Sequence, residues 1–286
     1  LQGAPFAAPS SPARSKANAI LKIELETLTE DVCLKDLNVD QLRFFIKGQE
    51  QHTFKLFELI MNNTLGISIA ESHQDERATH LPASALKAVG FDDEEAILPW
   101  SQRTFSGYRL MAEYFLFPQK YLFFDLTQLE GQLERFDNKV EITLFLSQTQ
   151  SELEHAVSVD NLAINATPII NLFERRSEPL SLDDGLDEYH VIPDVRRQDA
   201  FEIYSIDRVS ATTPNEEPIE FLPFYGSHRS LKDEMPKQFW HSRRESAEWA
   251  GGRMDDATEV HLSLVDLTFE LFKSDLPWTL NIETTC

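Results

Sequence analysis

Short runs in which apolar and polar residues alternate recur along this chain, and they constrain its fold more than any other feature of the sequence. In residues 19–28, Leu21, Ile23 and Leu25 alternate with polar and charged residues. This is the pattern of a strand with one buried face, and it is typical of antiparallel sheets. Similar runs occupy residues 42–48, 65–69, 140–147, 200–206, 259–267 and 278–284, and a less regular strand-like run occupies residues 162–173. We therefore expect an α+β fold that is mainly antiparallel β.

Two segments instead have a helical period. In residues 50–63, Phe54, Phe57 and Met61 recur three and four apart, and residues 151–157 open with a helix-capping pattern. Because a similar order of patterns restarts near Lys139, we expect two tandem β-rich modules with short inserted helices. The expected organisation is a linker or arm at 1–18, a first module at 19–136, and a second module at 137–286 with a long loop near 223–256.

The most aromatic segment, residues 107–126, has the length of a membrane span but not its composition. Seven of its twenty residues are aromatic. Four charged residues and a proline interrupt it: Arg109, Glu113, Pro118, Lys120 and Asp125. A membrane span needs about 20 nearly uncharged residues, so a crossing is excluded.

Split at Pro118, the same segment predicts a helix, a break and a strand. Leu110, Met111, Tyr114 and Phe115 form one helical stripe, with Arg109 and Glu113 paired on its flank. The strand at residues 120–126 is apolar on both faces. Its second face, which carries Tyr121 and Phe123, is covered either by this chain's own core or by another subunit.

The net charge limits the kinds of molecule that this chain is expected to bind, and the number of cysteines indicates the redox state of its compartment. The formal charge is −22 across 286 residues, which disfavours nucleic acid and anionic membrane surfaces as partners and suits a basic protein. Cys33 and Cys286 are too few for a disulfide framework, so a reducing cytoplasm is expected. We also expect this chain to be the middle piece of a longer protein.

The sequence lacks the common short motifs of catalytic, phosphate-binding and metal-binding sites. It has no Gly-rich phosphate loop, G-x-S-x-G elbow, C-x-x-C or H-E-x-x-H pattern, so no catalytic residue, cofactor or metal site is predicted. Glu188, His190 and Asp194 could in principle hold a metal, but a solvated acidic loop is the preferred interpretation. Three Arg-Arg pairs are expected to bridge acidic loops, or else a neighbouring subunit or an anion: 175–176, 196–197 and 243–244.

Six phrases, taken in order, resemble one known family. They occupy residues 97–126, 170–180, 188–209, 239–245, 264–269 and 283–286. They are similar to TssF (also called VasA or ImpG), a baseplate subunit of bacterial type VI secretion systems. The usual family member is about twice as long, so this chain resembles a central portion.

The resemblance implies a structural, non-enzymatic scaffold of the baseplate wedge, a phage-tail-like assembly for contractile injection. It implies TssG, TssK, TssE and the VgrG spike hub as partners, possible self-association, and a cytoplasmic location docked at the inner-membrane complex. The candidate interface or junction residues are Trp100, Arg103, Tyr108, Arg109, Tyr121, Phe123, Arg196, Arg197, Trp240 and Arg243. A carbohydrate- or ligand-binding β module is the alternative, and a metal-dependent hydrolase using residues 183–194 is third.

Overall fold

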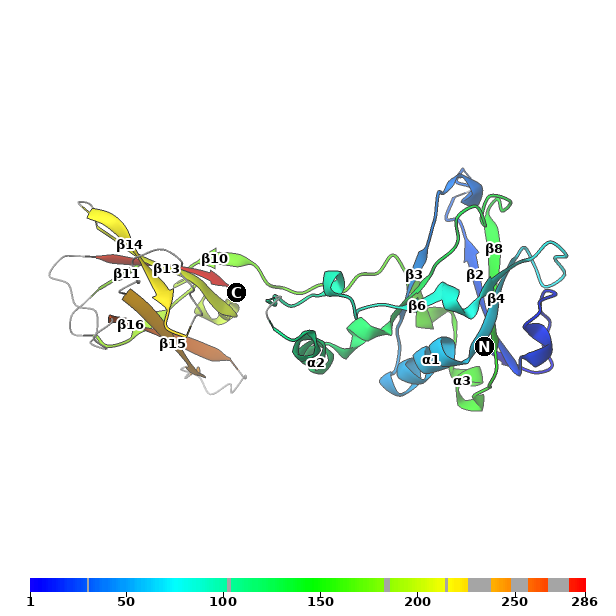
Figure 1. The fold of residues 1–286 in the computed structure, drawn as a ribbon, viewed down its shortest axis with the longest axis horizontal. Helices are drawn as coiled ribbons and strands as arrows, with labels where there is room; N and C mark the ends of the chain where they lie inside the picture. Colours follow the sequence, from blue (N-terminus) through cyan, green and yellow to red (C-terminus); the bar gives the residue numbers. More distant parts are fainter. Residues whose placement is uncertain are drawn as a thin grey trace. The chain divides into compact units, whose positions relative to one another are not determined.

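The chain folds into two compact units, residues 1–170 and 171–286 (Figure 1). The computed structural model describes residues 1–29, 31–101, 104–182, 186–213, 216–225, 238–247, 257–266 and 278–286. Each unit has its own hydrophobic core. Almost every strand pairing is antiparallel, so the predicted fold class is confirmed.

The described residues of unit 1, which spans residues 1–170, form two antiparallel sheets. The five-stranded sheet has the order β1 (Gln2–Gly3), β2 (Ala19–Glu26), β8 (Lys139–Leu146), β4 (Thr64–Ala70) and β5 (Thr79–Pro82). The four-stranded sheet has the order β6 (Leu86–Ala88), β7 (Phe123–Leu126), β3 (Leu42–Ile46) and β9 (Leu162–Ile164).

Three α-helices lie in the described part of unit 1: α1 (Glu50–Asn63), α2 (Ser106–Leu116) and α3 (Ser151–Ala156). Short 3-10 turns join the elements at Arg14–Lys16, Leu34–Asp36, Ala83–Ala85, Asp93–Glu95, Pro118–Leu122 (η5) and Val159–Asn161. Among the described residues, no helix combines the length and apolarity needed to cross a membrane. Figure 1 places α2 well apart from the five-stranded sheet.

Both sheets and α1 share the core of unit 1. The alternating residues of β2 and β8 point into it as the sequence predicts, with Leu21, Ile23, Ile142 and Leu144 all buried. Helix α1 is also confirmed, although its buried face is Leu56, Leu59 and Ile60. The predicted stripe of Phe54, Phe57 and Met61 lies at the flank of that face and is only partly buried.

The division between the units lies at Ile170 and Asn171, whereas the sequence placed it near residue 137. The reason is strand β8, which inserts between β2 and β4 in the five-stranded sheet. Residues 1–18 also differ from a free linker. Strand β1 pairs with β2, and Ala8 packs with Ile20 and Phe145 on the sheet face opposite the main core.

Unit 2, residues 171–286, is built on one large sheet. Its strand order is β10 (Glu174–Arg176), β17 (Thr279–Thr285), β13 (Ser205–Thr213), β14 (Glu216–Pro223), β15 (Gln238–Ser246), β16 (Thr258–Asp266) and β12 (Tyr189–Val191). Strand β11 (Leu180–Ser181) also pairs with β17, and a 3-10 turn spans Gln198–Ala200. Only β14 and β15 pair in parallel among the described strands.

Several elements predicted for the second half of the chain are shifted. The strand expected at 200–206 begins at Ser205 and continues to Thr213. The expected loop near 223–256 contains strand β15, and its residues 226–237 and 248–256 lie outside the described residues. Of the strand-like run at 162–173, Leu162–Ile164 forms strand β9 of unit 1, and Phe173 exchanges backbone hydrogen bonds with Cys286.

Candidate protein-protein interface

Helix α2 and the turn that follows it form the most unusual local structure of unit 1. The helix ends at Leu116, and the N–H of Phe117 donates to the carbonyl of Glu113 at 2.7 Å. Pro118 then begins the 3-10 turn η5. Proline lacks an N–H and disfavours helical backbone in the residue before it, so the predicted break is confirmed and has its expected cause.

The buried face of α2 is charged. The side chains of Arg109 and Glu113 are 1% and 0% exposed, and Lys120 from η5 is 1% exposed. Glu113 accepts hydrogen bonds from the Arg109 guanidinium at 3.1 Å and from the Lys120 ammonium. Its other oxygen accepts from the backbone N–H groups of Ile97 and Leu98 at 2.9 and 3.2 Å. We call Arg109, Glu113 and Lys120 the charge cluster.

Arg109 connects the charge cluster to the preceding loop. Its Nη2 donates to the carbonyls of Phe91 and Asp92 at 3.2 and 3.3 Å, and to the carboxylate of Asp93 at 3.3 Å. Its guanidinium also lies 5.2 Å from the ring centre of Trp100. The predicted pairing of Arg109 with Glu113 is confirmed, but in the protein interior and not on an exposed flank.

The surroundings of Glu113 favour its ionised form. Burial raises the pKa of this carboxyl, but the hydrogen bonds from Lys120 and from the N–H groups of Ile97 and Leu98 outweigh burial, so the pKa lies below its usual value. Tyr121 shows the opposite shift, because burial and the negative charge of Glu113 raise the pKa of its hydroxyl. Glu113 is therefore ionised near neutral pH, and the bonds of the charge cluster hold α2 against the loop before it.

The opposite face of α2 is apolar and exposed. The sequence predicted an apolar stripe on this helix without assigning the direction it faces. The helix turns most of that stripe outward, because the charge cluster occupies its inner face. Exposed fractions on this face are 68% for Tyr108, 59% for Met111, 49% for Tyr114, 77% for Phe115 and 71% for Leu116, and Phe105 just before the helix is 72% exposed. We call these six residues the α2 apolar face.

The exposed residues of the α2 apolar face are spaced like the anchor residues of helices that bind in a groove of another protein. Tyr108, Met111 and Phe115 stand at positions i, i+3 and i+7, which is how an amphipathic helix presents anchors to a groove on a partner. Single exposed apolar residues are ordinary, but a contiguous group marks an interaction surface. The geometry of α2 therefore supports binding to another protein.

Tyr121 and Phe123 are covered by this chain and do not form an open surface. They are 7% and 3% exposed. The Tyr121 hydroxyl donates to the carbonyl of Leu110 at 3.1 Å, and the Phe123 ring stacks on Phe45 with centroids 4.5 Å apart. Of the two alternatives for this strand, the chain's own core is the one found. They were candidates for an interface or a junction, and their burial within unit 1 leaves them no open surface for a partner.

The remaining candidates of unit 1 divide between the two faces of α2. Tyr108 lies on the exposed face, and Trp100 contacts the buried one through Arg109. Arg103 lies outside the described residues. Sequence reasoning missed Lys120 as a partner of Glu113, although its position after the proline offered a signal. It also missed Phe105 and Leu116 as exposed members.

Arg196, Arg197, Trp240 and Arg243 belong to unit 2 and do not form one site. Arg243 bonds Glu188 at 2.7 Å and also bonds Glu245. Arg197 lies 3.9 Å from Asp194 and 5.3 Å from the ring centre of Phe201. Arg196 is exposed, and Trp240 packs at the edge of the unit 2 core. The described contacts of the arginine pairs are mainly internal bridges to acidic residues, which was the first of the predicted roles.

Glu188, His190 and Asp194, which were considered as metal ligands but interpreted as part of a solvated loop, do not converge on one point. Arg243 holds Glu188, and Arg175 holds Asp194 at 2.6 Å, so both carboxylates bind arginines instead of converging with His190. His190 lies instead beside Glu259 and His261. The Glu-x-His spacing on a strand was the signal that could have indicated these two residues.

Comparisons with known proteins agree with the sequence resemblance. The family model described as "Type VI secretion system, TssF" matches residues 1–286. A curated relative, the type VI secretion system component TssF1 of Pseudomonas aeruginosa, is 32% identical over 231 residues, which are 80% of this chain and 37% of the relative. The chain thus spans little more than a third of that relative's length.

A solved structure is similar in fold. One chain of the type VI secretion system TssK-TssF-TssG baseplate subcomplex, determined by cryo-electron microscopy, matches with a TM-score of 0.69 and 24% identity. The match covers 93% of this chain and 47% of that one. The family match over all 286 residues decides the assignment, and this chain belongs to the TssF family of type VI secretion systems.

Proposed function

We propose that this chain is a structural, non-enzymatic scaffold part of the type VI secretion baseplate wedge and works through protein-protein contacts. The observation that carries the proposal is the inverted polarity of α2, whose charges are buried and whose apolar residues face solvent. Contact with another protein would remove these apolar side chains from water, which is favourable. Membership of the TssF family supports a baseplate as the setting.

TssG and TssK are the proposed partners. The support is the similar chain found in a solved complex named for TssK, TssF and TssG. Contacts to TssE and the VgrG spike hub, self-association, and a cytoplasmic location docked at the inner-membrane complex belong to the same proposal. These further parts rest on the sequence resemblance alone.

The α2 apolar face is large enough to anchor such a contact. Full burial of a Phe, Leu or Met side chain contributes about 1.5–3 kcal/mol, so two or three of these residues would supply most of the energy of an interface hot spot. Aromatic residues and Met are enriched in the cores of interfaces. We therefore expect binding energy to concentrate on Phe115, Met111 and Tyr108.

A charge placed on this face tests the proposal. Phe115→Glu in the full-length protein is expected to reduce co-purification with TssG and TssK at least tenfold, because a carboxylate would be buried without a partner. Val159→Glu is the matched control, since Val159 is 87% exposed in unit 1 but lies away from α2 in the chain. Equal yields from both variants and the unaltered protein would contradict the proposed surface.

The ligand-binding alternative fits the aromatic residues less well. Carbohydrate sites need a concave groove lined by Trp and Tyr, whereas the α2 aromatics lie on the convex surface of a helix. Trp240 and Trp278 pack with the unit 2 core. The assembly role is therefore the better-supported function.

A further inference from the structure

Strands β12 and β16 bring two histidines and a glutamate together on one sheet face. The strands are antiparallel, and His190 stands directly opposite His261. Glu259 precedes His261 by two residues, so both side chains leave β16 on the same side. Their neighbours point into the core and are buried: Tyr189, Val191, Val260 and Leu262.

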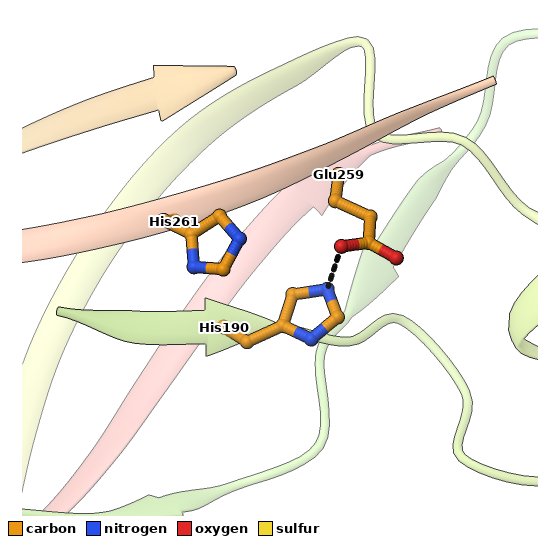
Figure 2. A group of neighbouring side chains, drawn as sticks. All are labelled: His190, Glu259 and His261. Atoms are coloured by element: carbon orange, nitrogen blue, oxygen red, sulfur yellow. Dashed lines mark ion pairs between the residues drawn. The ribbon is translucent and has the colours of Figure 1, made fainter. Parts of the chain in front are cut away.

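The three side chains converge at their ligand-bearing ends. Each offers one nitrogen or oxygen, and these three atoms lie within 4.8 Å of one another. Figure 2 shows the His190 ring between Glu259 and His261, with its nitrogen directed at the carboxylate. The Nε2 of His190 and Oε2 of Glu259 are 4.0 Å apart, and the two imidazole centroids are 5.0 Å apart at 18°.

An ion pair alone accounts poorly for this arrangement. A separation of 4.0 Å is too long for a hydrogen bond, which needs about 2.7–3.2 Å. Two parallel imidazoles would repel each other if both were protonated, whereas neutral imidazoles are metal ligands. Within the described residues, His190 and His261 have no hydrogen bond that competes for their ring nitrogens.

We propose that His190, Glu259 and His261 bind one Zn²⁺ ion. Zinc takes imidazole nitrogen and carboxylate oxygen at about 2.0–2.2 Å, which in a tetrahedron places ligand atoms about 3.3 Å apart. Small rotations of the three side chains would bring their ligand atoms, now within 4.8 Å of one another, to that separation. Two His and one carboxylate are a recurrent zinc ligand set, in which the fourth position is open to water.

The surroundings permit a cation. All three residues are half-buried, so an ion can enter from solvent. A cavity of about 190 Å³ adjoins His190 and Glu259 and leaves space for a bound water. Arg243 stands opposite His261 on β15, but its charge is held by Glu188 and Glu245. A bound zinc ion would link the three-residue strand β12 to β16.

Zinc titration of the full chain, first treated with chelator, tests the site. We expect one Zn²⁺ per chain by calorimetry at pH 7.5, together with a higher melting temperature. His190→Ala and His261→Ala are each expected to weaken binding at least tenfold, and His73→Ala, an exposed histidine of unit 1, should leave it unchanged. Should the alanine variants fold poorly, Glu259→Gln keeps the shape of the side chain and should weaken binding in the same way.

Cobalt provides a second readout of the same ligands. Co²⁺ bound by imidazole and carboxylate gives visible absorption without the thiolate charge-transfer bands that ligation by Cys33 or Cys286 would produce. The proposal is overturned if the unaltered chain binds no stoichiometric Zn²⁺, if His190→Ala and His261→Ala bind it normally, or if thiolate bands accompany Co²⁺ binding.

Discussion

Replacing Glu113 by alanine should release α2 from unit 1. The carboxylate is fully buried and accepts hydrogen bonds from Arg109, Lys120 and two backbone N–H groups. Its removal leaves two buried cations without their shared counter-ion. Breaking a buried ion pair by removing one partner costs about 3–5 kcal/mol.

The loss should be local, because the charge cluster joins α2 to a loop and to η5 and not to the core of the sheets. A cost of about 3 kcal/mol corresponds to a roughly 100-fold larger open population, since about 1.4 kcal/mol is a factor of ten. Native-state hydrogen exchange of residues 106–116 measures this population directly. The amides of α1 should keep their protection.

Glu152→Ala is the matched control for this experiment. Glu152 also bonds two basic side chains, His52 and Lys55, but it is half exposed to solvent. Exposed ion pairs contribute little, so exchange should stay close to that of the unaltered protein. If Glu113→Ala changes α2 exchange no more than Glu152→Ala does, the charge cluster is not what positions the helix.

Three further predictions follow from the hydrogen bonds of unit 1. The hydrogen bond from Arg135 lowers the pKa of Asp75 from 3.8 to about 2. Asp75→Asn should therefore reduce the unfolding free energy at pH 7 by about 2 kcal/mol. In acid-unfolding curves, this difference between variant and unaltered protein should shrink between about pH 4 and pH 2. The pKa of Glu113 is also depressed, so its stabilisation of α2 should be complete above about pH 4.5 and should decline as the pH falls further. Hydrogen-exchange rates of the α2 amides measure this decline, and rates that do not depend on pH in this way would contradict the prediction. Tyr121→Phe removes the hydroxyl that donates to Leu110 and should cost about 1 kcal/mol, a fall of a few degrees in melting temperature; an unchanged value would show that this bond contributes nothing.

Local sequence patterns predicted the elements that bury one face. Strand β17 alternates cleanly, with Leu280, Ile282 and Thr284 buried, and its residues were expected to form a strand. Strand β15 was missed because none of its described residues is buried, so no period of two appears in its sequence. The local sequence pattern of a strand also does not indicate which other strand it pairs with. The position of β8 between β2 and β4 links residues far apart in the chain, and it moved the unit boundary to residue 170.

The candidate site was predictable in its parts but not in its orientation. A helix with an apolar stripe, a proline break and an Arg109–Glu113 pair could all be read from residues 107–118. Which face turns inward depends on partners from other segments, namely the carbonyls of Phe91 and Asp92 and the N–H of Ile97. A helical period carries no information about those partners, so the exposed apolar face emerged only from the fold.

Site-specific photo-crosslinking in the assembled baseplate tests the central claim most directly. A benzoylphenylalanine at position 115 replaces an aromatic side chain that is 77% exposed, so the fold should tolerate it. We predict a crosslink to TssG or TssK from position 115 and none from the control position 159. An absent crosslink at 115, in a baseplate that assembles normally, would show that the α2 apolar face is not the surface through which this chain works.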